Sequence, residues 1–235
     1  MNTSHKHING YSLIELLVAT VLFTIIAGTI FSLLFSAQLR YSSESGLTTA
    51  FQQANVAIDQ ITRDLHSAGY PPPSSFLAGM AQTNPQLMAL PFSWSLGYPN
   101  APCTVNGSCG AVPGDYDLIL ETDTGDGKGV QWIRYSLQGT TLMRGMTPKI
   151  PFADPVASTS GGVMLPYVDN VMNGPGNKSL PMFRYRFDCT TPTPLPFPSN
   201  ICKVNIALIV QSAQLDPQTQ QPRTISLTGE AALFN

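Results

Sequence analysis

The chain has 235 residues, a formal net charge of −2 and a charged fraction of only 11%. A chain with this weakly acidic balance is not expected to have nucleic acid as its main partner. The length is sufficient for one globular domain of about 200 residues beyond an N-terminal leader and a membrane segment. Its 19 glycines and 20 prolines predict that loops occupy much of that domain.

The first long element is an apolar segment near the N-terminus. From Leu16 to Phe35 the chain runs for 20 residues without a charge or a proline. As a helix this run would be about 30 Å long, which matches the hydrocarbon core of a bilayer. The alternatives are an ordinary signal anchor and a cleaved secretory signal, and the apolar core of a secretory signal is shorter and ends at a small-residue site. We therefore predict one membrane-spanning helix at residues 11–36. Lys6 and Arg40 flank it, so the positive-inside rule leaves its orientation open.

A short motif stands where this segment begins. Residues 10–15 read Gly-Tyr-Ser-Leu-Ile-Glu and follow a short polar leader. This arrangement resembles the processing site of type IV prepilins, which pilins and pseudopilins share. The resemblance implies that a membrane peptidase removes residues 1–10 by cutting after Gly10 and methylates the new N-terminus at Tyr11. Tyr11 stands where phenylalanine is commonest, and the proline that often kinks the pilin helix midway is absent.

Glu15 is the one charged residue on the apolar run. A carboxylate at the centre of a bilayer costs about 2.5 to 3.5 kcal/mol, so a partner is expected. Cleavage after Gly10 would create a positive amine at Tyr11, on the same chain or on a neighbouring subunit. The resemblance implies the same assembly role for Glu15. Alternatively, the side chain simply reaches the headgroups from the helix end.

The apolar helix is predicted to continue beyond the membrane. All 20 prolines lie at or after Pro71, and apolar residues recur at steps of three and four between Leu47 and Ala68. We predict a helix from about Ser12 to His66, with residues 37–70 as an amphipathic continuation. Its weakest helix propensity is at residues 41–46. The apolar stripe favours packing on the chain's own domain over a separate partner-binding face. Residues 61–70 also resemble the end of the long helix in PilW-type minor pilins.

Residues 71–235 are predicted to form a β-rich domain. Residues 71–114 show no sustained period and are predicted to be an irregular connection. Alternating patterns predict strands at residues 115–122, 129–137, 141–144, 183–187, 204–210 and 225–230, with a glycine-rich hairpin turn at 123–128. The predicted fold class is α+β, with the long helix packed on an antiparallel sheet and long loops. This is also the pilin architecture.

Four cysteines suggest disulfides in an oxidising compartment. Proximity in sequence favours Cys103 with Cys109 and Cys189 with Cys202. A metal site is disfavoured because the spacing is not of the CxxC type and histidines are scarce. Asp123 and Asp126 in the hairpin turn are weak calcium candidates, and a glycine-rich turn explains them better.

No nucleotide-binding glycine loop, nucleophile elbow or spaced carboxylate pair is present, so we expect no enzyme activity and no cofactor. The resemblance predicts a minor pilin whose partners are prepilin peptidase, other pilin subunits, the inner-membrane assembly platform and lipid. It would cross the bacterial inner membrane once, with a periplasmic C-terminal domain, and then enter a pilus or pseudopilus. The J-type pseudopilin of type II secretion is an alternative. A membrane-anchored periplasmic enzyme or binding module, with a pocket in residues 71–114, is an alternative of another class.

Overall fold

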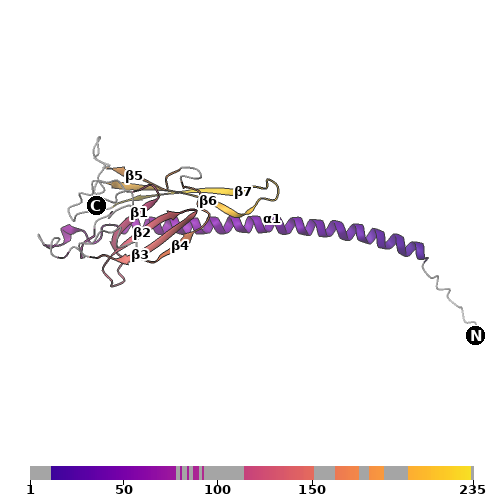
Figure 1. The fold of residues 1–235 in the computed structure, drawn as a ribbon, viewed down its shortest axis with the longest axis horizontal. Coiled ribbons are helices and arrows are strands. Elements are labelled where there is room, and N and C mark those ends of the chain that lie inside the picture. The colour runs from indigo at the N-terminus through magenta and orange to yellow at the C-terminus, as the bar shows by residue number, and fades with distance from the viewer. Residues whose placement is uncertain are drawn as a thin grey trace, which may run out of the picture.

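The computed structural model describes residues 12–77, 80, 84, 87–89, 92, 114–150, 162–174, 180–187 and 201–233. A single long helix projects from a domain that contains two β-sheets (Figure 1). The elements in chain order are α1 (Leu13–Ser67), the short 3-10 helix η1 (Pro73–Ser75), β1 (Asp117–Asp123), β2 (Val130–Gln138), β3 (Thr141–Pro148), β4 (Met164–Val168), β5 (Phe183–Phe187), β6 (Ile201–Leu215) and β7 (Pro222–Ala232).

Helix α1 is 55 residues long and runs without interruption through residues 41–46, where propensity is lowest. The prediction of one helix from Ser12 to His66 is therefore confirmed. Gly69 follows the helix with a positive φ of 83°, a conformation that favours glycine. The Gly69 N–H donates to the Glu121 carbonyl at 2.8 Å, and the Thr122 hydroxyl donates to the Ser67 carbonyl at 2.7 Å. The C-terminal end of α1 is thus joined to β1.

The strands form two antiparallel sheets, ordered β1-β2-β3-β4 and β5-β6-β7. The predicted α+β class, with antiparallel strands packed on the long helix, is confirmed, and the strands divide between two sheets. Strand β4 was not predicted, because Met164–Val168 lacks alternation and contains Pro166. Proline is tolerated here because β4 is an edge strand of its sheet.

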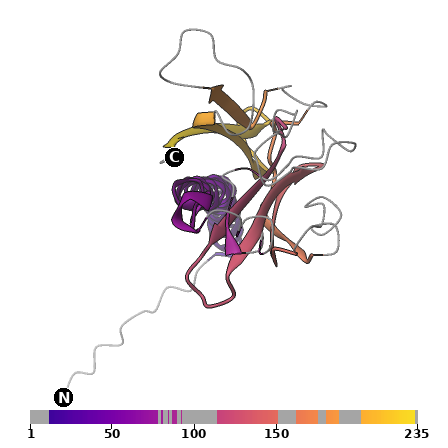
Figure 2. The same cartoon turned by 90° about the vertical axis from the view of Figure 1, so that its left-hand side faces the viewer.

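The two sheets are joined through the segment that follows β4. Val171 forms an antiparallel bridge with Val210 of β6. Asn173 is fully buried, and its side chain donates to the Ala207 carbonyl and accepts from the Ile209 N–H, both at 2.8 Å. Seen end-on, α1 lies in the angle between the two sheets (Figure 2). The two sheets and the second half of the helix therefore share one core.

The helix approaches the second sheet closely because small residues face it. Ala54 and Ala57 are fully buried beside Ile61 and Leu65, which confirms that the apolar stripe packs on the chain's own domain. Across from them, a Cβ added at Gly229 of β7 would lie 2.6 Å from Cγ2 of Ile58. Since that methyl is on a branched side chain held in the core, a larger residue at 229 would push the helix and sheet apart.

Gly229→Ala is therefore expected to destabilise the domain by about 1 to 3 kcal/mol through overpacking. Urea denaturation of the full chain in detergent measures the loss. Thr228→Ala, at the exposed neighbouring position, is the control and should change stability by less than about 0.5 kcal/mol. Equal stability of the two variants would show that the space between Ile58 and Gly229 accommodates an added methyl group without overpacking.

A buried polar network joins α1 to the first sheet. The Tyr135 hydroxyl donates to Oδ2 of Asp64 at 2.6 Å, and Arg144 donates to the same carboxylate oxygen at 3.0 Å and to the Tyr135 hydroxyl at 3.0 Å. Gln60 donates to the other oxygen of Asp64 at 2.7 Å. Burial, with the nearby Asp64 charge, raises the pKa of Tyr135 far above its ordinary value, so its hydroxyl stays protonated as a donor.

Tyr135→Phe removes this donor and leaves Asp64 with two partners. Unfolding in urea should show a loss of about 1 to 3 kcal/mol. Tyr167→Phe is the matched control, because the Tyr167 ring packs 6.3 Å from the Tyr135 ring while no hydrogen bond of its hydroxyl is found among the described residues. If both variants lose the same stability, ring packing rather than the hydroxyl accounts for the effect.

Candidate assembly site on the N-terminal helix

The domain leaves almost all of the N-terminal half of α1 uncovered. Residues 12–41 are exposed apart from a half-covered Ala27, and Phe23, Phe31 and Leu33 are 72%, 72% and 71% exposed. Within the described residues, α1 is the one helix long and apolar enough to cross a membrane. A surface of this size and apolarity needs lipid or other apolar helices around it.

The three threonines of this half form hydrogen bonds within the helix itself. The hydroxyls of Thr20, Thr24 and Thr29 each donate to a backbone carbonyl three or four residues earlier, at 2.7 to 2.9 Å. These internal hydrogen bonds remove the need for a polar partner outside the helix. These three threonines can therefore sit in hydrocarbon, or against another apolar helix, with their hydroxyls satisfied.

Glu15 is held at the first turn of α1. The Ser12 N–H donates to its Oε2 at 2.9 Å, and the Glu15 N–H donates to the Ser12 carbonyl at 3.0 Å. This satisfies an N–H that the helix leaves without a partner. The cap was not predicted, although Ser-x-x-Glu is the spacing that signals a capping box. Gly10 and Tyr11 lie outside the described residues, so cleavage and the amine partner stay predictions.

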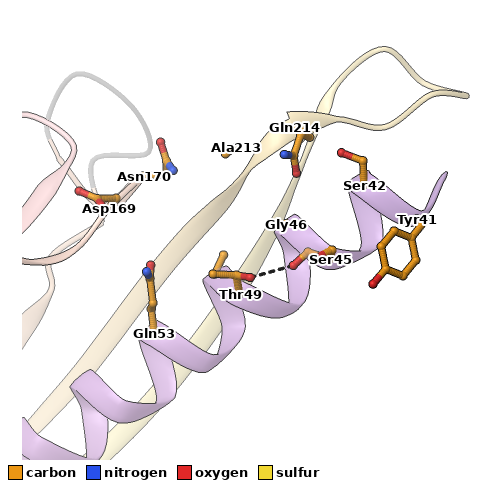
Figure 3. Close-up of a pocket in the computed structure, with 11 residues that line it drawn as sticks. Tyr41, Ser42, Ser45, Gly46, Thr49, Gln53, Asp169, Asn170, Ala213 and Gln214 are labelled. Carbon is orange, nitrogen blue, oxygen red and sulfur yellow. Dashed lines mark hydrogen bonds between the residues drawn. The ribbon is translucent and has the colours of Figure 1, made fainter. Parts of the chain in front are cut away.

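A polar groove of about 490 Å³ lies where the exposed half of α1 enters the domain (Figure 3). Gly46 lies beside the Gln214 side chain, since an added Cβ would lie 2.1 Å from its Oε1, an atom at the end of a flexible side chain. The side chains that line the groove are mostly uncharged and include Ser45, Thr49, Gln53, Asp169, Asn170 and Gln214. Among the described residues that line the groove, no hydroxyl is hydrogen-bonded to a carboxylate, and the Thr49 hydroxyl donates to the Ser45 carbonyl.

The two calcium candidates, Asp123 and Asp126, accept hydrogen bonds from residues in and next to their own hairpin turn. Asp123 accepts from the Gly125 N–H at 2.8 Å, and Asp126 accepts from the Lys128 N–H at 3.0 Å and from the Gln131 side chain at 2.9 Å. The Lys128 N–H and the Gln131 amide lower the pKa of Asp126 to about 2. No cluster of three or more metal-ligating side chains occurs among the residues that the structure describes.

Of the four cysteines, only Cys202 lies within the described residues, and it is disulfide-bonded. Cys103, Cys109 and Cys189 lie outside them, so both pairings stay predictions. Most of the 71–114 connection, where a pocket was considered, also lies outside. Its described part includes Phe92, which bridges to Leu120 and packs edge-on against the Tyr185 ring at 6.1 Å.

Comparison with protein families gives one match, which covers the start of the chain. The model of the prokaryotic N-terminal methylation motif matches residues 5–31, which include Gly10, Tyr11 and Glu15. The chain carries a prepilin-type signal. Comparison with curated proteins and with solved structures gave no match.

The signal supports a protein of the type IV pilin or pseudopilin type, processed by prepilin peptidase. It suggests a structural subunit rather than an enzyme. Together with the apolar half of α1, it is consistent with a single-pass anchor in the inner membrane.

Proposed function

We propose that this chain is a minor type IV pilin, cut after Gly10, methylated at Tyr11 and incorporated into a pilus or used to prime one. One observation carries the proposal: the methylation motif is followed directly by an apolar helix that its own domain leaves uncovered. Before assembly the helix would hold the protein in the inner membrane with the domain in the periplasm. Its partners would be prepilin peptidase, the assembly platform and other pilin subunits.

The two halves of α1 support a subunit rather than a free enzyme with an anchor. The second half is built into the core, so any force on the first half reaches the domain through an unbroken helix. A simple anchor needs no such rigid connection. Mass spectrometry of sheared surface filaments tests the proposal, because a minor pilin should be found in them and a J-type pseudopilin should be absent. Deletion of the gene for a J-type pseudopilin would instead stop protein secretion.

We also propose the disulfides Cys103–Cys109 and Cys189–Cys202. The oxidised state of Cys202 supports the second pair, and residues 190–201 would form a closed loop worth about 3 kcal/mol in the chain-entropy model. Both disulfides require the oxidising side of the membrane, which is where the proposed orientation places the domain.

Processing is tested by Gly10→Val, which should block cleavage because a bulky residue replaces glycine at the site of the cut. Intact-mass measurement should find Met1 retained in this variant and Tyr11 as the methylated N-terminus of the unaltered chain. Gly28→Val is the matched control, because a Cβ at position 28 meets nothing within 4 Å. A normally cleaved Gly10→Val chain would contradict the predicted site.

The role of Glu15 is tested by two variants that separate its cap from its charge. Glu15→Gln keeps an oxygen that can accept from the Ser12 N–H but loses the charge, whereas Glu15→Ala loses both. If the charge pairs with a subunit's N-terminal amine, both variants should be cleaved and inserted but reach sheared filaments at about one tenth of the normal level.

Normal incorporation of Glu15→Gln, with loss of Glu15→Ala, would show that capping alone matters. Normal incorporation of both would remove any assembly role for Glu15.

A further inference from the structure

The turn between β6 and β7 lies at the level where α1 leaves the membrane. Arg40 is five residues beyond Phe35, the last residue of the uncharged apolar run. At about 1.5 Å per residue its Cα lies roughly 7 to 8 Å past the hydrocarbon edge, at the outer limit of the headgroup layer, and Glu44 lies roughly 6 Å further out. In Figure 1 the β6–β7 turn is the part of the domain that reaches furthest along α1 towards the N-terminus.

The turn is fastened to the helix by one arginine. Arg223 donates to Glu44 of α1 at 2.8 Å and also to Asp216 in the turn. Asp216 accepts in addition from the N–H groups of Gln218 and Thr219 at 2.8 and 3.2 Å. The turn therefore has a fixed shape and a fixed position beside residues 40–44 of the helix.

A cavity of about 260 Å³ lies between the turn and the helix, and Arg40, Ser43, Glu44 and Arg223 are among the residues that line it. Ser43 is only 3% exposed, and its hydroxyl has no hydrogen-bond partner. Arg223 is already engaged by two carboxylates, whereas Arg40 makes no ion pair with any described residue. A free guanidinium and an unpartnered hydroxyl remain to bind an acceptor.

The chemistry of the lining selects the ligand. Arg40 and the Ser43 hydroxyl can donate to a phosphate. The Glu44 side chain is 63% exposed and retains oxygen lone pairs for a donor ammonium group. The cavity thus offers a cation and an anion side by side at the outer surface of the membrane, which fits a zwitterion that projects from the surface better than a simple anion.

We propose that this cavity binds the headgroup of phosphatidylethanolamine in the leaflet that faces the domain. The phosphate contacts Arg40 and Ser43, and the ammonium group contacts Glu44. The bound lipid holds the β6–β7 turn against the membrane and fixes the orientation of the domain before assembly. The inference rests on the membrane-anchored state in the proposed function.

The test uses the full chain in phosphatidylcholine vesicles that contain a trace of phosphatidylethanolamine with a photoactivatable group close to the glycerol, which leaves the headgroup ammonium unmodified. After illumination, labelled peptides are mapped by mass spectrometry. Labelling should concentrate in residues 40–44 and 216–223, and unlabelled phosphatidylethanolamine should compete for it. Arg40→Ala should reduce labelling about tenfold, the effect of losing a hydrogen bond to a charged group. Ser43→Ala should also reduce it.

Arg184→Ala, which removes an exposed arginine from β5, is the control and should leave labelling unchanged. Competition by phosphatidylglycerol as strong as that by phosphatidylethanolamine would overturn the proposal, since it would show attraction of any anionic lipid to Arg40. Labelling that is equal in Arg40→Ala and the unaltered chain would also overturn it.

Vesicle flotation separates this inference from the proposed function. A chain that floats with the vesicles but is not labelled at the cavity refutes the lipid site and leaves the pilin proposal intact. A chain that is labelled at the cavity but absent from sheared filaments supports the lipid site and contradicts the pilin proposal.

Discussion

The continuity of α1 is the constraint on which the rest of the structure depends. One backbone of 55 residues must satisfy two environments, because its first half is bare and apolar while its second half lies between two sheets. A helix is the structure that meets both demands, since it satisfies its backbone hydrogen bonds internally in lipid and in protein. The change of environment occurs within a few residues, between exposed Tyr41 and buried Ser43.

The domain surrounds the second half with apolar contacts on one side and polar contacts on the other. Alanines allow the β6–β7 sheet to approach, while the network of Asp64, Tyr135 and Arg144 fixes the rotation of the helix against β2 and β3. A second buried group secures the connection after the helix. Glu121 accepts from the Trp132 indole and from Lys149, and Lys149 also donates to the Met88 carbonyl.

Much of this arrangement could be predicted from sequence because its signals are local. The absence of proline before residue 71 and the spacing from Leu47 to Ala68 predicted α1 and its buried face, and alternation predicted β5, β6 and β7. The motif at residues 10–15 indicated the type of protein. Strand β4 could not be predicted, because its pairing with β3 is decided across the sheet and not by alternation within Met164–Val168.

The division into two sheets and the polar network could not be predicted from the sequence either. Asp64, Tyr135 and Arg144 come from three elements, and the partners of Asp64 are 71 and 80 residues away. No local pattern marks residues that meet only after folding. Ser43 and Arg223 likewise read as ordinary polar residues of a helix and a strand, and only the position of the β6–β7 turn brings them to one cavity.

The three threonines of the apolar half have a mechanical consequence. Since each threonine hydroxyl is already bonded to its own backbone, these three side chains present neighbouring helices with dispersion contacts and not with hydrogen bonds. At these three positions a neighbouring helix would therefore be held by the fit of the two surfaces and not by a hydrogen bond between them.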